Sequence, residues 1–192
     1  MGFDRFQGIG LLILLLFAAT TSAQQSVDKQ IEQIRKTYTE LSEKIATTEK
    51  DEESGKTSNL AVNELVINKL DRSWAAVGIF RITYRFYYQN KEEEPYPTEL
   101  VKVTRNAEIS ARKYFEEFVY DSSGSLIFYF ERSEDDDAPF ERRIYFAKGK
   151  PIRIIEDKAA RDRFTKDDRS KIDEILERSS NASEIFIHSI KD

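Results

Sequence analysis

The residues that could act as a nucleophile or a base are few in this chain. His188 is the single histidine of the 192 residues, and the sequence contains no cysteine. A Ser–His–Asp triad or a Cys–His pair would have to be built around that one imidazole. Ser123 and Ser125 flank Gly124 without forming the Gly-x-Ser-x-Gly turn of a serine hydrolase. Since zinc sites usually draw on several Cys or His ligands, we predict neither a catalytic residue nor a metal site.

Carboxylates are the remaining candidates for acid–base or metal chemistry. Glu117 and Glu131 have the same strand parity and could lie on neighbouring strands, which is the minimum for hydrolysis of a glycoside. Nearby arginines would lower their pKa values rather than raise one to make an acid. The acidic run Glu134–Asp137 could hold calcium, but it lacks the spacing and the glycine of an EF-hand. We interpret it as a solvated loop that protects a sheet edge.

Phosphate and nucleotide sites are disfavoured by the glycine pattern. Gly55-Lys56-Thr57 resembles the end of a phosphate-binding loop, but Lys50 stands where that motif requires glycine. After residue 23 the remaining glycines are too scattered for a dinucleotide fingerprint. The net charge of −5 argues against a nucleic-acid partner. We expect no cofactor.

Binding is better supported than catalysis, because Arg and Tyr recur at strand positions of one parity. These two residue types carry many interface hot spots. The candidate binding residues are Arg81, Arg85, Tyr87, Tyr129, Arg143, Tyr145 and Arg153. We expect them on an exposed sheet face, and the simpler interpretation is a solvated face held by cross-strand Arg–Glu and Tyr pairs. The alternative hypothesis is that this face docks a protein or an envelope polymer.

The elements that would position these residues are mostly strands. From Phe80 to Tyr88 large apolar and polar side chains alternate, which is typical of a strand with one buried face. Turns at 120–126 and 146–152, each with a glycine, predict two hairpins. We predict an α+β fold: an N-terminal helix, an antiparallel meander of about six to seven strands, and a C-terminal helix packed on one sheet face.

One sheet face is expected to be apolar and covered by the two helices. Its predicted members are Phe80, Ile82, Tyr84, Phe86, Phe118, Leu126, Phe128, Phe130, Ile144, Phe146, Ile152 and Ile154. Burial of each such side chain contributes roughly 1.5–3 kcal/mol, so the face must be covered.

The two predicted helices differ in their signals. Residues 25–49 carry an apolar stripe that packs on the sheet or, alternatively, self-associates through 27–45 as a coiled coil. A polar linker is expected at 49–59. Thr165–Asp168 resembles a capping box that opens a helix over 166–189, with a strand at 184–190 as the alternative.

Residues 1–23 have the pattern of a secretory signal, with an apolar run at 9–19 and small residues before Gln24. Cleavage is predicted after Ala23, which would place a protein without stable membrane insertion in the periplasm or outside the cell. An uncleaved membrane anchor is the alternative. The expected division is therefore a signal at 1–23, a helix and linker at 24–58, and a sheet domain at 59–192.

Two functions follow from this pattern, and a third is weaker. The first is an exported, non-catalytic binding or structural module of the bacterial envelope. The second is a carrier of a small hydrophobic ligand held between the helices and the aromatic sheet face, which would need a cavity of roughly 300 Å³ or more. The third is a carboxylate-dependent hydrolase.

Overall fold

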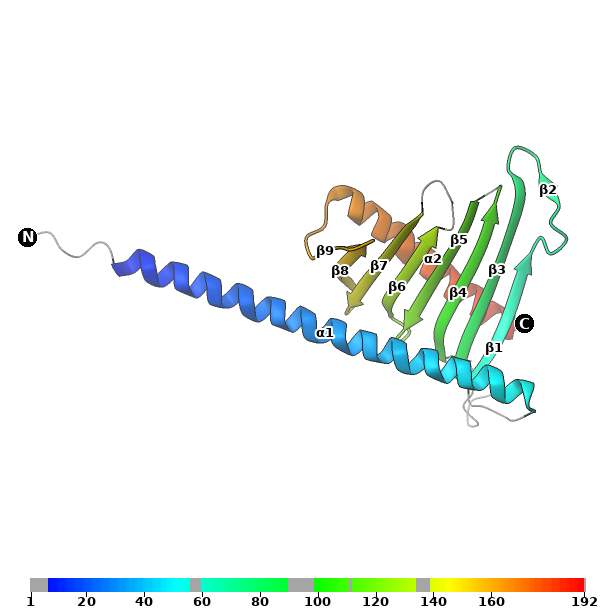
Figure 1. The fold of residues 1–192 in the computed structure, drawn as a ribbon, viewed down its shortest axis with the longest axis horizontal. Coiled ribbons are helices and arrows are strands. Elements are labelled where there is room, and N and C mark those ends of the chain that lie inside the picture. Colours follow the sequence, from blue (N-terminus) through cyan, green and yellow to red (C-terminus); the bar gives the residue numbers. More distant parts are fainter. Residues whose placement is uncertain (1–6, 56–59, 90–98, 111, 134–138, 192) are drawn as a thin grey trace, which may run out of the picture.

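The protein consists of a long helix, an antiparallel sheet and a second helix, as a computed structural model shows (Figure 1). The structure describes residues 7–55, 60–89, 99–110, 112–133 and 139–191, and side chains from residue 25 onward. The elements are α1 (Gln7–Glu53), β1 (Leu60–Ile67), β2 (Ser73–Trp74), β3 (Gly78–Gln89), β4 (Glu99–Ile109), β5 (Arg112–Tyr120), β6 (Leu126–Ser133), β7 (Phe140–Ala147), β8 (Lys150–Glu156), β9 (Ala159–Arg161) and α2 (Lys166–Lys191).

The sheet is an antiparallel meander, which confirms the predicted fold class. Its strand order is β1-β3-β4-β5-β6-β7-β8-β9, and the short β2 pairs with the start of β3, making nine strands in the described part of the chain. The count exceeds the prediction because β2 and β9 have only two and three residues. Both predicted hairpins are present, and Gly124 and Gly149 take positive φ values of 78° and 71°.

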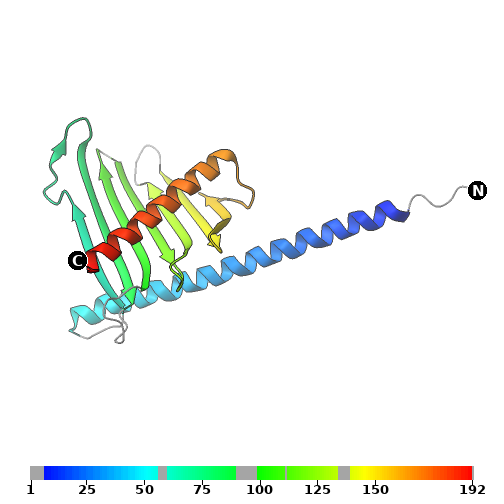
Figure 2. The same ribbon diagram turned by 180° about the vertical axis from the view of Figure 1, so that it is seen from behind.

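The two helices lie on opposite faces of the sheet, as the two views in Figures 1 and 2 show. α2 crosses one face diagonally, whereas α1 crosses the other face near one end of the strands. The expectation that both helices cover a single apolar face was therefore wrong. The sheet has apolar groups on both faces, so each helix buries a separate set.

The α2 face forms the larger core. Ile175 and Phe186 of α2 are fully buried, and the Phe186 ring packs 5.9 Å from Phe86 and 5.1 Å from Tyr88. The predicted capping box is present: the Thr165 hydroxyl accepts from the Asp168 amide, and the Asp168 carboxylate accepts from the Thr165 amide. The helix continues through 184–190, so the alternative of a last strand there was wrong.

α1 buries its predicted apolar stripe against the opposite face. Ile31, Ile34 and Ile45 are buried, and Val27, Tyr38 and Leu41 pack beside them. The stripe thus serves the fold of this chain, and pairing with a second helix would require it to leave the sheet. Within the described residues, no helix is long and apolar enough to cross a membrane.

Strand β6 faces the opposite way from the prediction. Phe128 pairs with Tyr145, and Phe130 pairs with Arg143, so all four side chains share the α1 face. Tyr129 points to the α2 face, where it is fully buried. Because β6 carries aromatic rings at both parities, hydrophobic alternation cannot assign its faces. β-bulges lie between residues 87 and 88, 119 and 120, and 145 and 146. Each bulge changes which side chains of its strand point to a given face of the sheet.

An element boundary also differs from the prediction. The helix extends into the expected linker as far as Glu53. Gly78 follows a tight turn and begins β3, with φ +78°. The acidic run at 134–137, expected as a loop, and the end of the expected linker at 56–59 lie outside the described residues.

Candidate functional site

The structure separates the seven candidate binding residues instead of gathering them on one exposed face. Tyr129 is 0% exposed beneath α2. Tyr87 and Tyr145 are 6% and 2% exposed, because α1 covers this end of the opposite face. The prediction of an exposed face was wrong for these three tyrosines.

The four candidate arginines all have acidic partners. Arg81 pairs with Asp71, and Arg85 pairs with Glu64, in exposed contacts at the β1–β3 side of the sheet. Arg153 is held by Asp162 and by Asp28 of α1; the hydrogen bonds that it donates to Asp162 are the main reason that its pKa is raised. Arg143 pairs with Glu141 of its own strand. Of the seven, only Arg143 and Tyr145 meet at a cavity.

That cavity is a groove of about 450 Å³ between α1 and the sheet. We call it the α1 groove. Its walls are formed by Arg35, Tyr38, Thr39, Phe128, Phe130, Arg143, Tyr145 and Ile155. Residues 35, 38 and 39 lie on one side of α1 because positions three and four apart are neighbours on a helix. The sheet residues come from β6, β7 and β8.

The floor of the α1 groove is aromatic. The centre of the Phe128 ring lies 5.0 Å from the centre of the Tyr38 ring, in an edge contact, and 5.2 Å from that of the Tyr145 ring, in a tilted contact. Such arrangements place the electropositive edge of one ring against the face of another. Phe128 and Tyr145 are buried, whereas Phe130 is only partly buried and borders the open side. Phe128 and Tyr145 therefore form a closely packed base, and the accessible aromatic surface of the groove comes from the partly buried Phe130 and Tyr38.

Two guanidinium groups lie at the rim. The Arg35 Nε donates a hydrogen bond to the Tyr145 hydroxyl at 3.2 Å, and its guanidinium lies 5.6 Å from the centre of that ring. The Arg143 guanidinium lies 5.2 Å from the centre of the Phe130 ring. Stacking on aromatic faces orients a guanidinium without using its outer N–H donors. Both arginines thus present donors beside an apolar floor.

A buried charge cluster lies beside the groove. Lys102 pairs with Glu117 at 2.5 Å, with both side chains less than one-tenth exposed. The Tyr38 hydroxyl donates to Glu117 at 2.7 Å, and Lys102 lies 5.2 Å from the Tyr38 ring centre. Burial, together with the bond to Glu117, raises the pKa of Tyr38 to about 12. This tyrosine therefore stays protonated at neutral pH and acts as a donor.

The carboxylate pair proposed for hydrolysis does not exist. Glu117 pairs with Phe130 and faces α1, whereas Glu131 lies opposite Glu116 and faces α2. The predicted pair failed because β6 has the reverse orientation.

Glu116 and Glu131 do share a face, and both are buried, but cations hold each of them. Arg105 and Arg178 contact Glu116, and Arg142 contacts Glu131. Between them Tyr129 donates to Glu116 at 2.7 Å; burial and the charge of Glu116 raise the pKa of this tyrosine far above its ordinary value. These groups form a closed network under α2.

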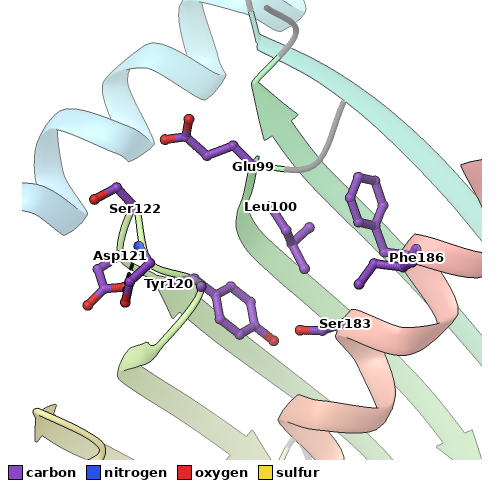
Figure 3. A pocket seen from close by; sticks show the side chains of 10 residues that line it. Glu99, Leu100, Tyr120, Asp121, Ser122, Ser183 and Phe186 are labelled. Carbon is purple, nitrogen blue, oxygen red and sulfur yellow. Dashed lines mark hydrogen bonds between the residues drawn. The ribbon is translucent and has the colours of Figure 1, made fainter. Parts of the chain in front are cut away.

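A second hollow of about 290 Å³ lies where the β5–β6 turn meets α2 (Figure 3). Leu100, Tyr120 and Phe186 form its apolar side, and Asp121 lies at the turn. Burial alone would raise the pKa of Asp121, but hydrogen bonds from Ser123 and Ser125 hold it below its ordinary value. Asp121 is thus committed to the turn.

Metal ligands do not gather in the described part of the chain. Among those residues, no group of three or more His, Asp or Glu side chains is placed to hold an ion. The acidic run 134–137 considered for calcium lies outside the described residues.

Arg35, Tyr38 and Phe128 were not predicted as parts of a binding site. Tyr38 falls within the apolar stripe of the predicted helix at 25–49, Phe128 was assigned to the apolar sheet face, and Arg35 is one of many charged residues on that helix. The sequence signal for this site was the spacing of Arg35, Tyr38 and Thr39, which places the three side chains on one side of a helix.

Comparison with models of protein families, with curated proteins and with solved structures finds no match for this chain.

Proposed function

We propose that this protein is an exported, non-catalytic binding module that holds a small ligand with an apolar body in the α1 groove. The observation that carries the proposal is the groove itself: about 450 Å³, with an aromatic floor between α1 and the sheet. Small-molecule sites are typically concave, largely apolar, and 300–1,000 Å³ in volume. The groove lies within that range.

The arrangement of charged groups supports binding rather than catalysis. General acid–base catalysis needs a titrating group within reach of a substrate. The described buried carboxylates, which are Glu116, Glu117, Glu131 and Asp168, are each engaged by a cation. His188 lies on the exposed side of the last turns of α2. Neither set of groups lines the α1 groove.

A small ligand is favoured over a macromolecular partner spread across the sheet face. The tyrosines proposed for such a partner are buried, and Arg81 and Arg85 lie in exposed ion pairs near β1. Export to the periplasm or beyond is proposed from the signal-like pattern of residues 1–23.

The experiment is a titration of the purified protein with the neutral dye Nile red, followed by fluorescence. We expect saturable binding, and its loss on Thr39→Trp, because an indole at this exposed wall position fills the groove. The matched control is Thr47→Trp, since Thr47 is exposed on α1 but does not line the groove. Absence of saturable binding, or equal binding by both variants, would contradict the proposal.

A further inference from the structure

We infer that the α1 groove selects organic anions, with a carboxylate bound by Arg35 and Arg143 and an apolar chain lying along Phe128 and Phe130. The inference rests on the proposed function and specifies its ligand class. Its starting point is the composition of the walls, which among the described residues include two arginines and no acidic residue.

Arg35 supplies a charge without a counter-ion in the described structure. It is exposed on α1, and within the described residues it has no ion-pair partner. Its Nε is used by the Tyr145 hydroxyl, and the stack on Tyr145 holds the group against the groove. The Nη groups are then left to donate hydrogen bonds to a ligand carboxylate, since guanidinium groups bind planar anions through parallel N–H bonds.

Arg143 faces the same space from the sheet. Its only carboxylate contact in the described chain is Glu141, and their side chains are 35% and 38% exposed. Exposed pairs of this kind contribute little free energy, so a ligand carboxylate can share or displace Glu141. The stack on Phe130 keeps the guanidinium beside the apolar floor.

The nearest buried acid does not cancel this charge. Glu117 is already neutralised by Lys102 at 2.5 Å and accepts the Tyr38 hydroxyl at 2.7 Å. The groove thus combines excess positive charge at its rim with rings and Ile155 along its walls. A molecule with one carboxylate and an apolar chain matches both parts, whereas a cationic analogue would meet two like charges.

The test is displacement of Nile red by decanoate, decanol and decylammonium, all below their micelle-forming concentrations. These probes each have ten carbons, nearly the same apolar chain, and different head groups. We expect decanoate to compete at least about tenfold more tightly than decanol, because a charge-assisted hydrogen bond is worth more than a neutral one. Decylammonium should compete least.

The double variant Arg35→Gln/Arg143→Gln should lose the preference for decanoate while keeping the affinity for decanol. Arg85→Gln is the control, since Arg85 lies on the same sheet face but outside the groove. Equal competition by decanoate and decanol, or an unchanged preference in the double variant, would overturn the anion inference and leave the binding function standing. If Nile red itself fails to bind, the proposed function falls with it.

Discussion

The two helices cover the two faces of the sheet to different extents. α2 lies diagonally over one face and leaves Ile144, Phe146 and Ile175 fully buried (Figure 2). α1 crosses only one end of the other face, so Phe130 and Arg143 stay partly exposed beside it. Because α1 lies across the ends of the strands, it buries only a stripe of that sheet face and leaves the side chains beside the stripe accessible (Figure 1). This difference makes one face structural and the other a candidate for binding.

Charged groups follow the same division. On the α2 face, cross-strand pairing sets Arg105, Glu116, Glu131, Arg142 and Glu156 in one row over five strands. Each charge in the row contacts an opposite one, which is what burial of Glu116 and Glu131 requires. On the α1 face, Arg35 has no such partner among the described residues.

Core truncation should separate the faces most strongly. Phe186→Ala removes a fully buried ring and is expected to lower the free energy of unfolding by about 3–5 kcal/mol. Phe130→Ala removes a partly exposed ring, and about 1–2 kcal/mol is expected. Urea unfolding of both variants measures the difference. Equal losses would show that the α1 face is packed as tightly as the α2 face.

Breaking the charge row is expected to have the next largest effect on the free energy of unfolding. Glu116→Gln leaves Arg105 and Arg178 without their shared carboxylate, and about 3 kcal/mol of stability should be lost. Glu64→Gln breaks an exposed pair with Arg85, 46–50% accessible, and should cost at most about 1 kcal/mol. Chemical denaturation compares the two. A mild effect of Glu116→Gln would mean that the row contributes little to the closed face.

The start of α2 should show a pH dependence. Hydrogen bonding from Arg161, with further bonds from Thr165, holds the pKa of Asp168 well below its ordinary value despite burial. Its stabilising contribution is therefore complete above the unfolded pKa of about 3.9 and is lost as pH falls through the folded pKa.

Asp168→Asn should consequently cost about 1–2 kcal/mol at pH 7, and this difference should shrink below about pH 4. Thermal unfolding across pH measures it. The control is Asp167→Asn in the same turn, where the residue is exposed. If the loss of stability caused by Asp168→Asn grew at low pH, the lowered pKa assigned to Asp168 would be contradicted.

Tyr38→Phe should give the smallest effect. It removes the hydroxyl that donates to Glu117 but keeps the ring against Phe128 and the Lys102 pair. A loss of about 1 kcal/mol is expected. Urea unfolding beside Tyr84→Phe, a partly buried tyrosine of the α2 face, provides the comparison. A loss above that for Glu116→Gln would reverse the ranking of the two faces.

The fold was largely predictable because its signals are local. Alternation in β3, glycines in the hairpin turns, the stripe from Val27 to Ile45 and the cap at Thr165 each specify one element. The site was less predictable, because it depends on which way β6 faces. Phe128, Tyr129 and Phe130 offer aromatic rings to both sides, and only the pairing with β7 decides between them. Docking of α1 on the second face is likewise a tertiary choice.

The most direct test of the central claim is a methyl NMR titration of isoleucine-labelled protein with decanoate. Ile155 lines the α1 groove, whereas Ile144 and Ile175 are fully buried on the α2 face. We predict saturable shifts of the Ile155 methyl signals with little change at Ile144 and Ile175. Shifts confined to Ile144 and Ile175, or none at Ile155, would contradict the division between a closed structural face and a binding face.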